Sequence, residues 1–202
     1  TDKTYGDSDF AITATASSGL TVNFEVAENC TLSGNFVHIT GAGNCTITAH
    51  QAGNDRYYPA VEVSQVVKIN KSIIFVTALN RSREYSDPDP KLTYKVSRSD
   101  GFSGNAKCST TADRYSPTGN YPITCNQGTL NSQNYEFQFV EGKLTVEREK
   151  VKVNYTSDRI LFFPARKRYP LIIELEAILI QENDRYKGDI TKARVRFELK
   201  SL

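Results

Sequence analysis

The sequence predicts an all-β protein made of small β-sandwich modules in an extended array. Three observations support this prediction. Apolar and polar residues alternate over short runs, which is typical of half-buried strands. Clusters of Gly, Asn, Ser and Pro separate these runs and indicate turns. Hydrophobic residues make up 39% of the chain, with no Met or Trp, and they are mostly the β-branched and aromatic types that favour strands.

The chain also repeats itself. A Tyr-Gly-Asp-Ser-Asp motif at residues 5–9 returns as Tyr-Ser-Asp-Pro-Asp at residues 85–89, and Gly-Asn-Cys-Thr-Ile-Thr at 43–48 returns as Gly-Asn-Tyr-Pro-Ile-Thr at 119–124. A repeat of about 80 residues is too long for a solenoid unit and fits small domains in tandem. We therefore expect three modules, at residues 1–70, 71–148 and 149–202.

In the first module, alternation and turn signals predict four strands. They cover residues 22–26, 36–39, 45–49 and 61–69. In the second module the same criteria predict strands at residues 92–96, 121–125, 135–139 and 144–146. The joins between modules are short and strand-like, so we expect little bending between neighbours.

The third module does not match the repeat. We expect strands at residues 150–155, 160–163, 171–180 and 192–199, of which the third has one strongly apolar face. Four strands are about half of an immunoglobulin-like sandwich of roughly 100 residues. We therefore expect this part to pack on the second module, or to be completed by strand addition from another chain, which would produce self-association.

The four cysteines fall two to a module. Cys30 and Cys45 lie in the first module, and Cys108 and Cys125 lie in the second. Close pairs inside small domains predict one local disulfide in each. The alternative is metal binding, but the sequence has no Cys-x-x-Cys and its histidines lie elsewhere. Disulfides place the protein in a periplasmic, cell-surface or secreted setting.

Several segments carry a resemblance to known bacterial modules. The Tyr-Ser-Asp-Pro-Asp-Pro motif at 85–90, Gly-Asn-Tyr-Pro-Ile-Thr at 119–124, Asn134-Tyr135 and Glu-Gly-Lys-Leu-Thr-Val at 141–146 together resemble the MBG domain, a β-rich repeat of bacterial surface and adhesin-like proteins. Residues 16–57 resemble the bacterial Ig-like repeats that often precede MBG units, and residues 154–197 resemble the start of a further Ig-like module. The resemblance implies no catalytic residues, and the cysteines depart from the usual pattern of such repeats.

The residues themselves give little evidence for an enzyme. His38 and His50 stand alone, and a nucleophile needs an adjacent base held by a third group. The net charge is +2 with both signs dispersed, which gives no basis for nucleic-acid binding. No run is long and apolar enough to cross a bilayer. We therefore expect no catalytic site, no nucleic-acid partner and no membrane span in this sequence.

Acidic residues gather in three loops and leave two interpretations open. Calcium takes six to eight oxygen ligands, which carboxylates in loops can supply. Asp is also a common turn residue, because it bonds its own backbone. The residues in question are Asp7, Asp9, Asp87, Asp89, Glu182, Asp184 and Asp189.

Taken together, the sequence predicts a non-catalytic stalk or adhesion segment of a bacterial cell-surface or secreted protein. Its modules would act as rigid spacers, with neighbouring repeats and a protein or glycan ligand as partners. The alternative is an accessory glycan- or protein-binding module of a secreted hydrolase. Exposed aromatic residues would mark such a module, and Tyr57, Tyr58 and Tyr115 are the candidates.

Overall fold

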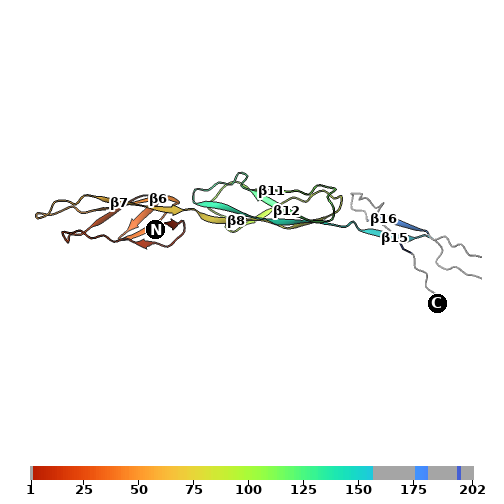
Figure 1. Ribbon diagram of the computed structural model, residues 1–202, viewed down its shortest axis with the longest axis horizontal. Coiled ribbons are helices and arrows are strands. Elements are labelled where there is room, and N and C mark those ends of the chain that lie inside the picture. The colour runs from red at the N-terminus through yellow and green to blue at the C-terminus, as the bar shows by residue number, and fades with distance from the viewer. Residues whose placement is uncertain (1, 157–175, 182–194, 197–202) are drawn as a thin grey trace, which may run out of the picture. The chain divides into compact units, whose positions relative to one another are not determined.

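The computed structural model describes residues 2–156, 176–181 and 195–196, and these residues contain strands and no helix. The expected all-β class is therefore confirmed (Figure 1). In this described part, no helix is long and apolar enough to cross a membrane. The chain divides into two compact units. Unit 1 comprises Thr1–Leu79, Leu92–Ser109 and Ile123–Gly142, and unit 2 comprises Asn80–Lys91, Thr110–Pro122 and Lys143–Leu202.

Sixteen strands are described. They are β1 (Lys3–Thr4), β2 (Phe10–Ala11), β3 (Asn23–Glu28), β4 (Cys30–Ser33), β5 (Phe36–Ile39), β6 (Gly43–His50), β7 (Val63–Asn70), β8 (Ser72–Ala78), β9 (Arg81–Glu84), β10 (Tyr94–Val96), β11 (Lys107–Thr110), β12 (Gly119–Asn126), β13 (Tyr135–Val140), β14 (Gly142–Glu147), β15 (Val151–Tyr155) and β16 (Ala177–Gln181).

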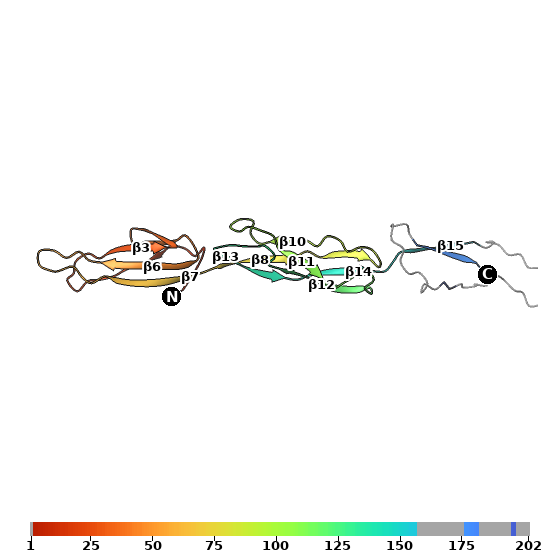
Figure 2. The same ribbon diagram turned by 90° about the horizontal axis from the view of Figure 1, so that it is seen from above.

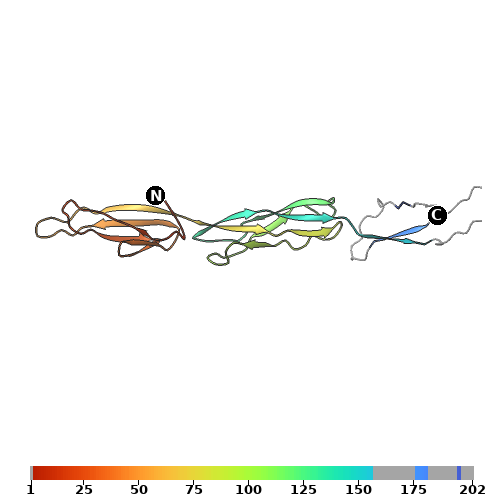
Figure 3. The same cartoon turned by 90° about the horizontal axis from the view of Figure 1, so that it is seen from below.

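Strands β1 to β7 form a two-layered body that we call the N-terminal sandwich. One sheet has the order β1-β7-β6-β3 and the other the order β2-β5-β4. Figure 2 labels β3, β6 and β7 of the first sheet side by side, and Figure 3 shows the same strands, in red to yellow, from below. Apolar residues at alternate positions face inward from both sheets, as the pleat of a strand requires. Their buried core consists of Cys30, Val37, Ile39, Cys45, Ile47 and Ile69.

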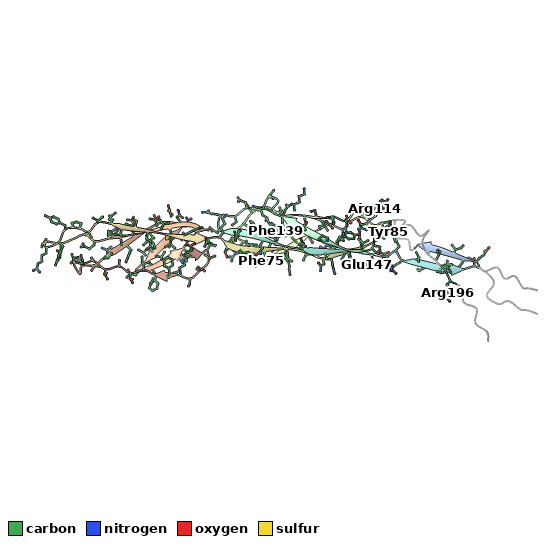
Figure 4. All side chains as sticks on the ribbon, viewed as in Figure 1. Phe75, Tyr85, Arg114, Phe139, Glu147 and Arg196 are labelled. Atoms are coloured by element: carbon green, nitrogen blue, oxygen red, sulfur yellow. A yellow bond between two sulfur atoms is a disulfide. The ribbon has the colours of Figure 1, made fainter. Side chains whose placement is uncertain are left out.

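A three-stranded sheet with the order β10-β8-β13 also belongs to unit 1. The central strand β8 runs antiparallel to β10 and parallel to β13. Its inward residues Ile74, Val76 and Ala78 are buried, while Phe75 points to the other face and is 44% exposed. Figure 4 labels Phe75 on β8 and Phe139 on the neighbouring β13. β8 is therefore the central strand of this sheet, because it pairs on both sides and buries every second side chain.

Two further sheets complete the described structure. The order of one is β11-β12-β14-β9, in which β14 runs parallel to β9. Leu144 and Val146 of β14 are buried. The last sheet is the antiparallel pair of β15 and β16.

The expected strands of the first two modules are present, with shifted ends. Val61 is an exception, because β7 begins at Val63 and Val61 lies outside any strand with 90% of its surface exposed. The pairing of β6 with β7 ends at Ala49 and Val63, and beyond it the amide of Ala60 donates to the carbonyl of Gln51. Of the expected third-module strands, 160–163, most of 192–199 and the first half of 171–180 lie outside the described residues.

The structure contains both expected disulfides. Cys30 is bonded to Cys45 with their Cα atoms 5.6 Å apart, and Cys108 is bonded to Cys125 with theirs 4.0 Å apart. The first bridge links β4 to β6, which lie in the two sheets of the N-terminal sandwich, and the second links the neighbouring strands β11 and β12. The described part of the chain has no free cysteine.

Candidate functional site

The connection between the N-terminal sandwich and the next sheet is a single residue. β7 ends at Asn70 and β8 begins at Ser72, so only Lys71 lies between them. The Nζ atom of Lys71 donates to the carbonyl of Ser132 over 2.8 Å. The amide of Ser72 donates to the carbonyl of Asn134 over 3.0 Å. A connection this short, bonded on both sides, leaves little backbone freedom.

The ring of Tyr135 is enclosed beside this connection. Tyr135 is 8% exposed. Tyr5 approaches it edge to face with the ring centroids 5.4 Å apart, and the Arg98 guanidinium lies 5.3 Å from its centroid. Gly101 has φ +80, and a Cβ at this position would lie 2.5 Å from the Tyr135 ring. Aromatic and cation–π contacts of this kind stabilise such an arrangement beyond the area that they bury.

Hydrogen bonds complete this region. The side-chain oxygen of Asn134 accepts from the amide of Ala42 over 2.9 Å. The Ser132 hydroxyl oxygen accepts from the amides of Asn134 and Tyr135 and donates to the carbonyl of Gly101. We call Tyr5, Ala42, Lys71, Asn134 and Tyr135 the junction cluster. It joins two loops of the N-terminal sandwich to the start of β13.

The guanidinium over Tyr135 is itself held in place. Arg98 forms an ion pair with Asp100, 2.8 Å from nitrogen to oxygen. The hydrogen bond and charge of Asp100 raise the pKa of Arg98. Both effects favour the charged form of a side chain that is already charged at physiological pH.

A tight turn delivers Tyr5 to the junction cluster. The amide of Tyr5 donates to the carbonyl of Asn70 over 2.9 Å, and that of Asp7 donates to the carbonyl of Thr4 over 3.0 Å. Gly6, between them, has φ +97, a conformation that glycine adopts without strain. The Asp7 carboxylate closes the turn by accepting from the amide of Thr4 over 2.8 Å.

The same turn occurs in unit 2. The amide of Tyr85 donates to the carbonyl of Glu147 over 2.9 Å, and that of Asp87 donates to the carbonyl of Glu84 over 3.3 Å (Figure 4). Ser86 takes the position of glycine with φ +67, which is unusual for a residue with a side chain. Its hydroxyl donates to a carboxylate oxygen of Glu149 over 2.9 Å, which offsets part of the strain.

A buried arginine anchors this second turn. The Arg83 side chain is 3% exposed, and its Nε atom lies 2.6 Å from a carboxylate oxygen of Asp89. Its terminal nitrogens donate to the carbonyls of Glu84, Asp113 and Arg114. A buried cation is tolerated only when it is paired and hydrogen-bonded in this way.

Three of the calcium candidates, Asp7, Asp9 and Asp89, have other partners in the described structure. Asp89 is paired with Arg83, Asp7 bonds the backbone of its own turn, and Asp9 lies 2.7 Å from His38. One oxygen of Asp87 is buried without a hydrogen bond from the described residues. In that same part, no three His, Cys, Asp or Glu residues gather as metal ligands. Glu182, Asp184 and Asp189 lie outside the described residues.

The candidate aromatic residues differ in exposure. Tyr58 is 95% exposed, Tyr57 50% and Tyr115 66%. The Arg114 guanidinium lies over the Tyr115 ring, 5.8 Å from its centroid. Tyr57 and Tyr58 belong to unit 1 and Tyr115 to unit 2. Of the two histidines, His38 contacts Asp9 and His50 lies at the end of β6.

Sequence reasoning missed Arg83 and Asn134. Arg83 lies in a run of polar residues, and Asn134 is named only among the residues that carry the family resemblance. The repeated motif could have pointed to Arg83, which lies two residues before the Tyr85-Ser-Asp87 turn.

No curated protein matches the chain. Residues 74–145 match the family model of the MBG domain (YGX type). The matched segment contains the Tyr85 turn, Arg83 and its partners, and the Asn134 and Tyr135 side of the junction cluster. This part of the chain, from β8 into β14, is therefore an MBG-type module.

Proposed function

We propose that this chain is a non-catalytic structural segment of a bacterial cell-surface or secreted protein, in which its modules form a stiff spacer for a ligand-binding region. The observation that carries the proposal is the junction cluster around the single-residue connection at Lys71. A binding site needs an exposed surface, whereas a stiff spacer needs side-chain contacts and hydrogen bonds that hold neighbouring modules together.

The family supports this reading. The MBG domain suggests a repeat module of surface proteins, and such domains are generally non-catalytic. Two disulfides add to the argument, because disulfides persist in oxidising compartments and are rare in the cytosol. A secreted, periplasmic or cell-surface location is part of the proposal.

The contacts at the junction explain how stiffness would arise. Bending at Lys71 would separate Tyr5 from Tyr135 and pull the Ala42 amide away from Asn134. The bent state would expose the Tyr135 ring, which is 8% exposed in the structure. Burial of an aromatic ring stabilises by roughly 1.5–3 kcal/mol, so we expect bent states to be a small fraction of the population.

Distance measurements across the junction test the proposal. Spin labels placed at Asn35 and Gln138, both exposed and both in unit 1, report on bending when attached through unnatural amino acids that spare the disulfides. We expect a narrow distance distribution that broadens in Tyr135→Ala. Tyr58→Ala is the matched control, since it removes an exposed tyrosine elsewhere, and should leave the distribution unchanged. A broad distribution in the unaltered chain would contradict the spacer function.

A second candidate function has one observation in its favour. Tyr57 and Tyr58 expose two adjacent aromatic rings in one loop of the N-terminal sandwich, and exposed aromatic rings are typical contacts for sugars and protein partners. The candidate is an accessory glycan- or protein-binding module. Saturable binding on a glycan array that is lost in Tyr58→Ala would favour it, whereas binding that survives this change would place the contact elsewhere.

A further inference from the structure

A groove of about 440 Å³ opens in the N-terminal sandwich, away from the residues of the junction cluster. Its floor is formed by Phe24, Ile47 and Ala49, which face inward from β3 and β6. One wall is the segment 13–16 and the other carries Ala60, Val61 and Val63. Val61 is 90% exposed and Val63 67% exposed, so one wall presents apolar side chains to water.

Apart from Val63, which begins β7, both walls are stretches of chain outside the strands. Within residues 2–156, which are described without a gap, residues 12–16 and 58–62 belong to no strand. The amides of Ile12 and Ala60 bond to Asn35 and Gln51, but neither segment pairs with a strand along its length. Backbone without a strand partner beside an apolar floor is the arrangement that accepts an added strand.

The MBG-type module shows which strand would fit. Counted from Tyr5 and Tyr85, residues 14–16 take the positions of β10 (Tyr94–Val96). Residues 58–62 come directly before β7, just as β13 comes directly before β14 in the MBG-type module. Residues 58–62 therefore take the position of β13. In the module, β10 and β13 both pair with β8, which lies between them. The two walls of the groove, residues 14–16 and 58–62, are therefore the counterparts of β10 and β13, the two strands that pair with β8.

The strand pairing beside the groove repeats as well. β1 runs parallel to β7 with Lys3 opposite Ile69, and β9 runs parallel to β14 with Arg83 opposite Val146. In the MBG-type module, β8 ends at Ala78 and β9 begins at Arg81, so two residues connect them. With the same spacing, a strand in the groove would leave two residues before Thr1, and it would reach β1 at Lys3 through those two residues followed by Thr1 and Asp2.

We propose that the groove of the N-terminal sandwich binds an extended strand of the β8 kind, joined in cis to Thr1. The strand has about seven residues with apolar side chains at alternate positions, like Ile74, Val76 and Ala78, which are buried in β8. It runs antiparallel to residues 13–16 and parallel to residues 58–62, and it covers Val61 and Val63. None of the junction residues lines this groove, so the proposal is independent of the spacer function.

An extended chain tests this. The sequence Ser-Ile-Ile-Phe-Val-Thr-Ala-Leu-Asn, copied from residues 72–80, is placed ahead of Thr1 so that its spacing to Tyr5 equals that of β8 to Tyr85. Hydrogen exchange should slow by at least about tenfold at the amides of residues 13–16 and of Tyr58, Val61 and Glu62. Pro59 has no amide hydrogen, and the Ala60 amide is already bonded to the carbonyl of Gln51. No slowing at these two segments would overturn the proposal.

Three controls decide what any protection means. In the first, the added copies of Ile74 and Val76 are replaced by aspartate, and protection should disappear. Protection that remains would show that apolar burial is not its cause and would overturn the proposal.

In the second control, Val61→Lys in the extended chain should reduce protection, because Val61 is exposed and its change leaves the fold intact. In the third, the protection should not depend on protein concentration. Protection found only at high concentration, or only with dimer formation, would mean exchange between chains and would contradict joining in cis.

Discussion

The ring of Tyr5 meets the ring of Tyr135 edge to face, with the centroids 5.4 Å apart and the planes at 89°. Tyr5 lies in the first turn of the N-terminal sandwich, and Tyr135 begins β13 of the MBG-type module. The contact depends on the Tyr5 turn, which is fixed by its bond to Asn70 just before the Lys71 connection. One repeated motif therefore positions an aromatic contact at the place where two sheets follow each other in the chain.

The first prediction is an energetic coupling between these two tyrosines. Edge-to-face pairs stabilise by about 0.5–1.5 kcal/mol beyond their burial. In a double-mutant cycle of Tyr5→Ala and Tyr135→Ala, we expect a coupling of about 1 kcal/mol in the free energy of unfolding, measured by urea denaturation. The cycle that combines Tyr58→Ala with Tyr135→Ala is the control. A coupling as large in the control would mean that the effect does not come from the ring contact.

The second prediction concerns the buried arginine. Arg83→Ala leaves Asp89 and the carbonyls of Asp113 and Arg114 without their donor. Removing one member of a buried ion pair destabilises by about 3–5 kcal/mol. We expect a loss of this size in the unfolding free energy. Lys95→Ala, an exposed change on β10, should stay within about 0.5 kcal/mol.

A small effect of Arg83→Ala would show that the loops it joins are held by other contacts. The exposed ion pair of Arg98 and Asp100 offers a further comparison, since exposed pairs contribute little to stability. Asp100→Asn should therefore have a far smaller effect than Arg83→Ala.

The third prediction concerns the two turns. Gly6 has φ +97, and a side chain in this left-handed region costs roughly 1–2 kcal/mol. Gly6→Ala should therefore lower the unfolding free energy by about that amount. Ser86→Gly relieves the same strain at φ +67 but removes the hydrogen bond to Glu149, so we expect a change of less than about 1 kcal/mol. Gly119→Ala is the control, because Gly119 is not among the residues with positive φ and a Cβ there would make only ordinary van der Waals contacts at 4.0 Å. Equal losses in Gly6→Ala and Gly119→Ala would contradict the argument.

The strands with one buried face could be predicted from the sequence, and those without an apolar pattern could not. Alternation of apolar residues identified β6 and β13, because each has one face in a core. β9 consists of Arg-Ser-Arg-Glu, and nothing in its composition indicates a strand. It is a strand because β14 pairs with it and because the loops around it satisfy the buried Arg83.

The candidate site divides in the same way. The cysteine pairs could be predicted, since two closely spaced cysteines in a small module have few alternatives. The bond between Ala42 and Asn134 joins residues that are 92 positions apart in the chain. This hydrogen bond forms only because the loop with Ala42 lies beside the start of β13. Local sequence patterns carry no information about such a contact between distant segments.

The last prediction is the order in which the two disulfides are reduced. Cys30 is 5% exposed and Cys45 is fully buried, whereas Cys108 and Cys125 are partly exposed. A thiolate must reach one sulfur to break the bridge, so access controls the rate. Under native conditions, mild reductant should therefore open Cys108–Cys125 first, and mass spectrometry after alkylation should identify the labelled pair. Each bridge closes a loop whose constraint stabilises by roughly 3 kcal/mol, so loss of one should lower the unfolding free energy without unfolding the N-terminal sandwich. With denaturant present, the two bridges should be reduced at similar rates, because burial no longer protects Cys30 and Cys45. Faster native reduction of Cys30–Cys45 would mean that the N-terminal sandwich opens more readily than its buried core implies.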